Sequence, residues 1–348
     1  MGVTMVSGSS VPTTSEASDL LELLDPIGAE LNRVEETLAE QVSKFAPQMT
    51  DYIGYVLGGT GKRLRPALAL LAAGGTGRID GSHITLGVIV ELIHVATLVH
   101  DDILDEARLR HRLPTSNSRW GNEVSVLLGD CLFARSLRLA AAYPTTTVCR
   151  RISEATNTVC SGEILQTQRR FDLGLELEQY LNIINMKTGA LFAVSCELGA
   201  LLNAAPVKAV ESLREFGSNL GIAYQIYDDC LDIFGQEHEA GKSLGTDVKT
   251  GKLTLPYLLL LRHAGASRRK ELGQIIFRDE PDARAKLLSV VMGNGVVTES
   301  LLIIDKYIAQ AEANLTGLPS NVYTKTLSDL LRFVAGRSRL LLNERIAE

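Results

Sequence analysis

The chain has 348 residues, 45% of them hydrophobic, with 41 acidic and 35 basic side chains and a formal net charge of −6. This composition excludes an intrinsically disordered chain and a small disulfide-rich scaffold, and the net acidity disfavours nucleic acid as a partner. Aromatic residues make up only 5% of the chain, whereas Leu and Ala are abundant, which favours helices over strands.

The N-terminal segment, residues 1–18, is small and polar and predicts a disordered tail rather than a secretory signal. The most apolar window, residues 85–99, is shorter than a membrane span and contains Glu91 and His94, so it indicates a buried helix. The five cysteines form no CxxC pair, as expected of reduced thiols without a zinc site. We therefore expect a cytoplasmic protein with no integral membrane segment.

Helical periodicity continues through most of the remaining chain. The predicted helices cover residues 19–46, a short segment between glycine-rich breaks at 58–66 and 74–82, and residues 82–107, 122–142, 145–168, 176–203 and 207–235. Residues 110–118 predict a loop, residues 235–252 a long polar loop, and residues 253–346 four or five further helices. No strand alternation, repeat or linker divides the chain, which predicts one all-α domain over residues 19–348.

Two matching carboxylate clusters each close an apolar segment. The stretches HDDILDEARLR and YQIYDDCLDIFG contain Asp101, Asp102 and Asp105, and Asp228, Asp229 and Asp232. On a helix, the first and last aspartate of each cluster share a face, where like charges repel. One such cluster is well explained as a solvated helix end. Two together indicate cation sites, and hard oxygen donors favour Mg²⁺ that bridges carboxylates to substrate phosphates.

Basic residues lie beside these acids. GTGKRLRP places Lys62, Arg63 and Arg65 at a predicted helix start, where backbone N–H groups favour an anion, although a solvated basic turn is the alternative. Further bases follow the first cluster or lie in the long loop: Arg108, Arg110, Arg112, Lys242, Lys249 and Lys252. His94, seven residues before Asp101 on nearly the same helix face, is either a core histidine or part of the same site. The grouping predicts a phosphorylated substrate held by metal and by Lys and Arg.

In order and spacing, seven stretches make the chain resemble the trans-isoprenyl diphosphate synthases (polyprenyl synthetases), of the long-chain type. They are GKRLRP, ELIHVATLVHDDILDEARLR, PTSNSRWGNEVSVLLGD, GEILQ, KTGALF, GIAYQIYDDCLDIFG and GKSLGTDVKTGKLTLP. The resemblance implies the isoprenoid synthase fold, a helical bundle around a central cavity, usually a homodimer. It implies a prenyltransferase that condenses isopentenyl diphosphate head-to-tail onto an allylic diphosphate primer, with three Mg²⁺ ions when diphosphate is bound.

The resemblance also implies roles for individual residues. Asp101, Asp105 and Asp228 match metal ligands, supported by Asp102, Asp229 and Asp232. Lys62, Arg65 and His94 match the isopentenyl diphosphate site. The positions that match the allylic side are Arg110, Lys187, Thr188, Gln225, Lys242 and Lys252. The residues expected to act in catalysis are Asp101, Asp102, Asp105, Lys187, Asp228 and Asp229.

One position departs from the family pattern, which commonly has two arginines followed by Gly. Here Arg110 is followed by His111 and Arg112. The second arginine usually faces isopentenyl diphosphate, so either His111 or Arg112 takes that place, and histidine is largely neutral near pH 7. We expect His111→Arg to lower the KM for isopentenyl diphosphate; an unchanged or higher KM would contradict this.

Product length depends on the residues one turn before Asp101. In the family a bulky aromatic there stops chain growth early, whereas here the residues are Ala96 and Thr97. Two small residues predict a long product, about heptaprenyl to nonaprenyl. Geranylgeranyl diphosphate is the alternative if a deeper residue blocks the channel, with Leu137, Leu165 and Phe192 as candidates. Farnesyl diphosphate synthesis, a terpene cyclase and a non-catalytic synthase subunit are the remaining alternatives, although the subunit would be expected to have lost its aspartates.

Overall fold

The computed structural model describes residues 15–59, 61–110, 113–235, 244–277, 283–292 and 295–343. In its first half the elements are α1 (Ser15–Leu23), η1 (Asp25–Ile27), α2 (Gly28–Val42), η2 (Pro47–Met49), α3 (Thr50–Leu57), α4 (Leu64–Thr76), α5 (Gly81–Leu104), β1 (Leu109–Arg110), β2 (Leu113–Pro114), α6 (Ser116–Trp120), α7 (Asn122–Ala140) and α8 (Thr147–Gln168). The second half contains α9 (Leu177–Ile184), η3 (Asn185–Gly189), α10 (Ala190–Leu202), α11 (Val207–Phe234), α13 (Thr246–Lys249), α14 (Leu255–Arg262), α15 (Ala266–Ile276), α16 (Ala283–Met292), α17 (Val296–Asn314) and α18 (Val322–Asn343).

The all-α prediction is confirmed, and the only strands in the described ranges are β1 and β2. They pair antiparallel, with Leu109 opposite Pro114 and Arg110 opposite Leu113. The two strands, each of two residues, overlap the segment 110–118, for which the sequence predicts a loop. Among the described residues after 253, five helices, α14 to α18, are present, in agreement with the predicted four or five.

Several predicted boundaries were wrong, for reasons that the structure makes clear. The helix predicted over residues 19–46 begins at Ser15, inside the predicted tail, and is interrupted at η1, where Pro26 cannot donate a backbone hydrogen bond. Helix α4 continues through Gly74 and Gly75 to Thr76. A Cβ atom on Gly74 would lie 2.5 Å from the Tyr323 ring, so this glycine lets α18 approach α4 rather than ending the helix.

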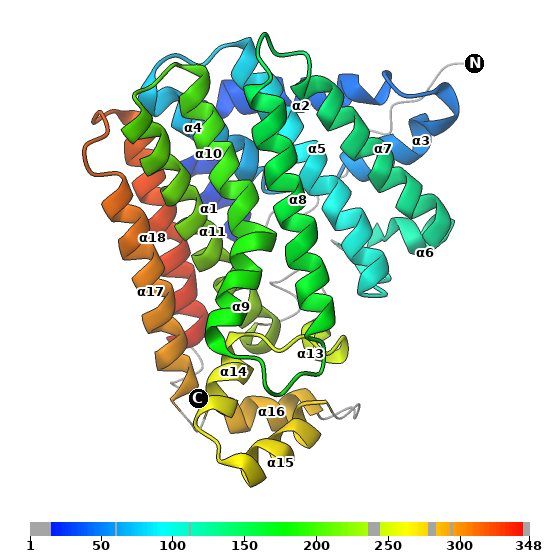
Figure 1. Cartoon of the computed structure of the whole chain (residues 1–348), viewed down its shortest axis with the longest axis vertical. Helices are drawn as coiled ribbons and strands as arrows, with labels where there is room; N and C mark the ends of the chain where they lie inside the picture. The colour runs from blue at the N-terminus through cyan, green and yellow to red at the C-terminus, as the bar shows by residue number, and fades with distance from the viewer. Residues whose placement is uncertain are drawn as a thin grey trace.

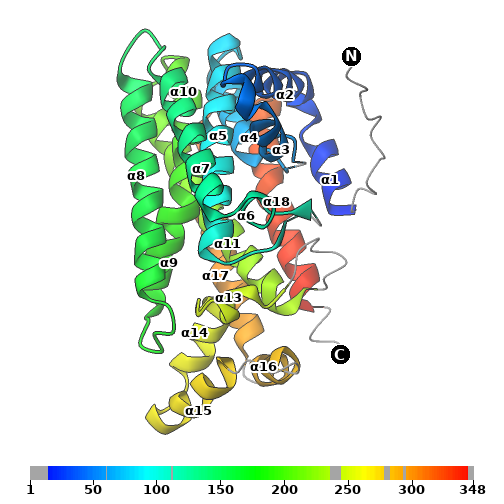
Figure 2. The ribbon, with the colours of Figure 1, turned by 90° about the vertical axis from the view of Figure 1, so that its right-hand side faces the viewer.

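The long helices run side by side through the molecule (Figure 1). In the perpendicular view, α8 and α9 form one side and α1 and α18 the other, with α5, α11 and α17 between them (Figure 2). Helix α10 packs against α4, α8 and α11, and α5 packs against α4 and α7. The four helices α4, α5, α10 and α11 therefore form the interior layer that carries most of the candidate site.

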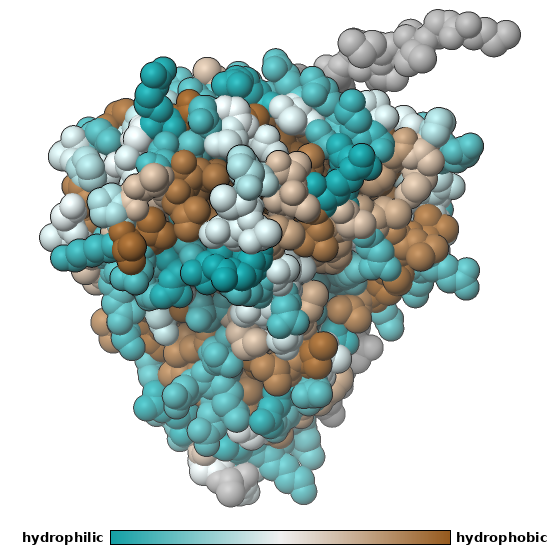
Figure 3. Space-filling model, turned by 45° about the horizontal axis from the view of Figure 1, so that its top comes forward, coloured by the Kyte–Doolittle hydropathy of each residue, from teal (hydrophilic) through white to brown (hydrophobic). Residues whose placement is uncertain are grey.

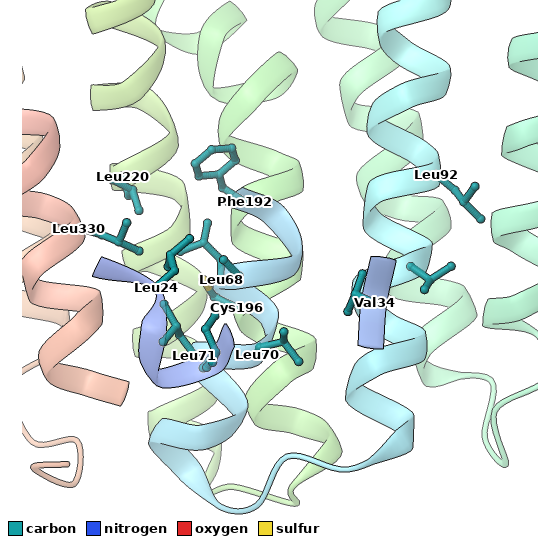
Figure 4. Packing of buried hydrophobic residues seen from close by; sticks show 14 of the residues in the cluster. Leu24, Val34, Leu68, Leu70, Leu71, Leu92, Phe192, Cys196, Leu220 and Leu330 are labelled. Atoms are coloured by element: carbon teal, nitrogen blue, oxygen red, sulfur yellow. The ribbon is translucent and has the colours of Figure 1, made fainter. Parts of the chain in front are cut away.

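The largest apolar cluster joins α1, α4, α5, α10 and α18 around the side chains shown in Figure 4, such as Leu68, Leu71, Phe192 and Leu330. A second cluster packs α11, α14 and α17 together at the other end of the bundle. Outside these cores, apolar and hydrophilic patches alternate on the surface seen in Figure 3. Burial of apolar side chains on this scale dominates the folding free energy.

Helix α5 has the length and composition of a membrane span, longer than the apolar window expected from the sequence. However, 72% of its most apolar window is buried inside the protein. Its apolar residues pack against α2, α4 and α7, which is the arrangement of a core helix.

Candidate active site

The first carboxylate cluster lies at the C-terminal end of α5. Asp102 is 5% exposed and accepts hydrogen bonds from Arg110 Nε at 3.0 Å and Nη2 at 2.8 Å. Asp105 accepts hydrogen bonds from Lys252 Nζ at 2.5 Å and from Arg170 Nη2 at 3.0 Å. Charge-assisted bonds of this kind fix both carboxylates where α5 ends. Lys252 comes from 147 residues later in the chain, so only the tertiary fold brings this pair together.

The second cluster lies at the end of α11. Asp229 is 5% exposed, and its carboxylate accepts hydrogen bonds from Tyr180 at 2.5 Å and from Gln225 Nε2 at 2.8 Å. Burial and the charge of Asp247 raise the pKa of Asp229 to about 8, although the bonds from Tyr180 and Gln225 oppose this shift. Gln225 in turn accepts a hydrogen bond from Thr188 at 2.6 Å.

Asp232, the third acid of this cluster, is 2% exposed and faces the start of α13. Its carboxylate lies 3.4 Å from the backbone nitrogens of Thr246 and Asp247 and 3.3 Å from Thr246 Oγ1. Backbone N–H groups at a helix start favour a carboxylate. This geometry indicates that Asp232 anchors the segment that leads to Lys252. This anchoring role is additional to the metal-binding role that the sequence predicts.

Arg110 links the two clusters. Burial disfavours its charge, but the hydrogen bond to Asp102 and the negative charges of Asp102, Asp101 and Asp228 outweigh burial and raise the pKa of Arg110. The Arg110 guanidinium thus contacts Asp102 of α5 and is also stabilised by the negative charge of Asp228 from the end of α11. The sequence predicted both clusters, and the fold brings them to one site.

Asp101 lies among charges of both signs. Burial raises the pKa of Asp101 to about 6; Lys187 and Lys252 lower it, whereas Glu163 and Asp105 raise it further. Within the described residues, no group of three or more His, Cys, Asp or Glu side chains is arranged to hold a metal ion alone. Mg²⁺ commonly binds one or two carboxylates together with substrate phosphates, so the all-carboxylate donor set fits an ion shared with a bound diphosphate.

A π-helical turn carries Lys187 and Thr188. The helix predicted over residues 176–203 is divided into α9, the π turn η3 and α10. Lys187 Nζ contacts Glu163 Oε2 at 2.6 Å and Gln166 Oε1 at 2.5 Å on α8. A Cβ on Gly162 would lie 2.8 Å from Met186 Cβ, so glycine allows α8 to approach this turn. Such π turns occur often at functional sites.

The residues matched to the isopentenyl side lie where α4 begins beside the middle of α5. Lys62 Nζ lies 5.9 Å from the centre of the Tyr224 ring, and Arg65 lies 5.0 Å from that of Phe192. Burial lowers the pKa of Arg65 to about 10, against the raising effects of Glu91, Tyr224 and Asp101. Burial and the positive charges of Arg65, Arg110 and Arg63 lower the pKa of His94 well below 6.5, which keeps the ring neutral at pH 7.

The two positions expected to control product length differ in their surroundings. Ala96 is fully buried in the core, whereas Thr97 is partly exposed and donates a hydrogen bond to the His94 carbonyl at 2.7 Å. Of the deeper candidates, Leu137 and Leu165 are 38% and 37% exposed, and Phe192 is buried against Arg65. His111, Arg112 and Lys242 lie outside the described residues.

Sequence reasoning did not single out four polar residues at or beside the site: Glu91, Glu163, Gln166 and Tyr180. Glu163 and Gln166 belong to the stretch GEILQ, so reading its polar residues individually would have found them. Tyr180 and Glu91 lie inside apolar helices, and the sequence contains no signal for the groups that they face.

Comparison with known proteins identifies the family of the chain. A family model described as polyprenyl synthetase matches residues 46–291. Heptaprenyl diphosphate synthase component 2 of Geobacillus stearothermophilus is 35% identical over 88% of this chain and 96% of the relative. Nonaprenyl diphosphate synthase of Mycobacterium tuberculosis is 32% identical over 89% of this chain and 93% of the relative. The crystal structure of a decaprenyl diphosphate synthase from Rhodobacter capsulatus superposes with a TM-score of 0.85 at 33% identity, covering 91% of this chain and 99% of that one.

Proposed function

The chain belongs to the polyprenyl synthetase family, and from this we propose that it is a Mg²⁺-dependent prenyltransferase that makes a long-chain all-trans polyprenyl diphosphate. Its substrates are isopentenyl diphosphate and an allylic diphosphate primer. The observation that carries the proposal is Arg110, which is hydrogen-bonded to Asp102 and is further stabilised by the charges of Asp101 on the same helix and Asp228 on a separate helix. A site with paired acids and bases suits a substrate with a diphosphate group and its counter-ions.

The reaction breaks the allylic C–O bond and forms a C–C bond. Loss of diphosphate leaves an allylic cation, the alkene of isopentenyl diphosphate attacks it, and a proton then leaves, with the released diphosphate as its acceptor. Lys187, Lys252 and Arg110 stabilise the charge that develops on the departing diphosphate. Asp101, Asp105 and Asp228, with Asp102 in support, would hold Mg²⁺, which would supply further charge neutralisation to the diphosphate. No side-chain nucleophile takes part.

Isopentenyl diphosphate is bound on the other side by Lys62, Arg65 and His94. The neutral His94 ring contributes as a hydrogen-bonding group rather than as a charge. The parts of α5 and α11 that precede the aspartates are rich in buried apolar residues, and such surroundings would limit the access of water to the cation.

The names of the relatives, heptaprenyl, nonaprenyl and decaprenyl synthases, favour a product of about 35 carbons or more. Small side chains at Ala96 and Thr97 support the same proposal. The test is chromatography of the product made by the purified chain from farnesyl diphosphate, labelled isopentenyl diphosphate and Mg²⁺. A dominant product of 20 carbons would instead identify a geranylgeranyl diphosphate synthase, and a cyclic hydrocarbon a terpene cyclase.

The proposal requires that this chain is catalytic without a second kind of chain. One relative is named component 2 of a synthase, so activity is first measured with the purified chain alone. Retention of all six aspartates supports a catalytic role. Inactivity that a second chain restores would show that the active enzyme is heteromeric.

We also propose that the protein is a cytoplasmic homodimer. Apolar side chains remain exposed on adjacent helices α7 and α8, among them Val126 (43%), Leu127 (63%) and Ile164 (59%). Exposed apolar patches are typical of association surfaces. Sedimentation analysis should give twice the mass of 37.7 kDa, whereas Leu127→Glu should shift the protein toward the monomer.

A further inference from the structure

Arg63, between Lys62 and Leu64, has an unusual backbone conformation. Its φ is 49° and its ψ 32°, in the left-handed region that non-glycine residues rarely adopt. Such a conformation costs free energy and persists only when the surrounding structure holds it. It directs the chain from the turn that carries Lys62 into the first turn of α4, where Arg65 lies.

The Arg63 side chain connects four parts of the molecule. Its guanidinium bonds Glu35 on α2 through Nε and Nη2, and Glu91 on α5 through Nη1 at 2.7 Å. Nη2 also donates to the Gly59 carbonyl at 3.1 Å and to the Leu57 carbonyl at 3.4 Å, at the end of α3. The fork of donors on arginine suits such a multiple contact better than the single ammonium of lysine.

Glu91 is the buried member of this network. Its side chain is 3% exposed, compared with 46% for Glu35. Its Oε2 atom has no hydrogen-bond partner among the described residues, and neither has the buried Arg65 Nε. A Cβ on Gly61 would lie 3.1 Å from Arg63 Nη1 and 3.7 Å from Glu91 Oε1, so the ion pair packs directly beneath the glycine turn. A buried carboxylate is costly unless paired, which ties Glu91 firmly to Arg63.

We infer that Glu91 is a positioning residue that acts through Arg63 to fix the turn carrying Lys62 and Arg65 for the diphosphate group of isopentenyl diphosphate. The inference rests on the proposed function. Glu91 does not touch the substrate in this role; it holds the residues that do. Positioning groups of this kind set the geometry of charged contacts before the substrate arrives.

The direction in which Glu91→Gln changes diphosphate binding distinguishes a positioning role from a purely electrostatic one. A negative charge near an anion site repels the anion, so Coulomb's law alone predicts that Glu91→Gln strengthens diphosphate binding. Positioning predicts the opposite result, because an amide accepts a weaker hydrogen bond from Arg63 and so loosens the link between α5 and the turn that carries Lys62 and Arg65.

The experiment compares Glu91→Gln, Arg63→Gln, Arg63→Lys and the double variant Arg63→Gln/Glu91→Gln in steady-state assays. Glu91→Gln should raise the KM for isopentenyl diphosphate about tenfold and leave that for farnesyl diphosphate within twofold. Arg63→Lys should be milder than Arg63→Gln. The double variant should be no worse than Arg63→Gln alone, because the two residues act as one unit.

Glu197→Gln is the matched control. Glu197 is a buried carboxylate on α10, 7% exposed and paired with Arg151 Nε at 3.0 Å, with no contact to the candidate site. The Glu197→Gln variant should lose about as much stability as Glu91→Gln. Its KM values for isopentenyl diphosphate and farnesyl diphosphate should both be unchanged. An unchanged or lower KM for isopentenyl diphosphate in Glu91→Gln, or an equal rise in both KM values, would overturn the inference.

Binding of inorganic diphosphate in EDTA, measured by calorimetry, provides a readout that does not depend on turnover. Without a divalent ion, binding depends on the basic residues. If the wild-type protein makes no prenyl product, the proposed function fails. In that case about tenfold weaker binding by Glu91→Gln still supports the inference, and equal or tighter binding refutes it.

Discussion

The hydroxyl of Tyr180 is buried together with the carboxylate of Asp229 and donates a hydrogen bond to it at 2.5 Å. Burial and the charge of Asp229 raise the pKa of Tyr180 well above 10, so the hydroxyl stays protonated and remains a donor. Through Gln225 the same carboxylate is connected to Thr188 on the π turn. Tyr180 therefore helps to set the position of an acid at the end of α11.

Removing this hydroxyl should affect both stability and rate. Tyr180→Phe leaves a buried acceptor without its donor, which costs about 1–3 kcal/mol of unfolding free energy. Urea denaturation measures this loss, and kcat should fall with it. Tyr143→Phe is the control, since the Tyr143 hydroxyl bonds the Ser82 carbonyl at 2.6 Å at the other end of α5. A stability loss without a change in kcat in both variants would contradict a role for Tyr180 in the site.

The neutral state of His94 predicts a pH dependence of stability. Its pKa in the folded protein is depressed, so below pH 6.5 the unfolded chain binds a proton that the folded chain does not. Folding stability must then fall as the pH drops through 6.5, by about 1.4 kcal/mol between pH 7.5 and 5.5 for this single group. The wild-type protein should lose that much more than His94→Gln over this range in denaturant titrations; equal losses would show that the His94 pKa is unshifted.

At the scale of single elements, α5 combines three functions. It forms part of the core, carries the first carboxylate cluster at its C-terminal end, and presents Ala96 and Thr97 one turn earlier. The periodicity of the sequence predicted the helix. The different exposure of Ala96 and Thr97 depends on the helices that pack around α5.

This difference predicts separate effects for the two positions. Thr97→Phe should shorten the main product to 20 carbons or fewer with little change in melting temperature, because Thr97 is partly exposed. Ala96→Phe should instead destabilise the protein by about 1–3 kcal/mol through overpacking. Product chromatography and thermal melts of both variants test this; an unchanged product from Thr97→Phe would place the length-determining wall elsewhere.

The π turn η3 is a feature that the hydrophobic periodicity of the sequence did not predict. Residues 176–203 show one continuous helical period, and nothing in the spacing marks residues 185–189. The turn forms where Gly162 of α8 and Gly221 of α11 approach it, since a Cβ on Gly221 would lie 2.8 Å from Gly189 Cα. The π turn thus lies where two other helices pack closely against it, a feature that sequence spacing does not contain.

At the scale of the whole molecule, separate apolar clusters support the bundle from both ends, and the charged site lies between helices that those clusters hold in place. We therefore expect the fold to remain stable without a metal ion. Three acids at the site are paired with bases before substrate binds: Glu163 with Lys187, Asp102 with Arg110, and Asp105 with Lys252 and Arg170.

Chelation should accordingly remove activity without unfolding the protein. In EDTA the product should disappear while the far-ultraviolet circular dichroism stays within a few per cent of its original intensity. Mg²⁺ with inorganic diphosphate should raise the melting temperature more than Mg²⁺ alone, because the ion is shared between carboxylates and phosphate. A large loss of helix on chelation would mean that the metal is structural.

The sequence by itself determined the helical class, the order of most helices, and the two aspartate clusters with their neighbouring bases, because these features depend on local periodicity and on residue types at short spacing. It did not determine the pairing of Lys252 with Asp105, of Tyr180 with Asp229, or of Arg63 with Glu91. Those contacts join residues that are 147, 49 and 28 positions apart in the chain. Only the packing of apolar helix faces brings such residues within hydrogen-bond distance, so only the tertiary structure decided which charges are buried, which are paired, and which face one another across the site.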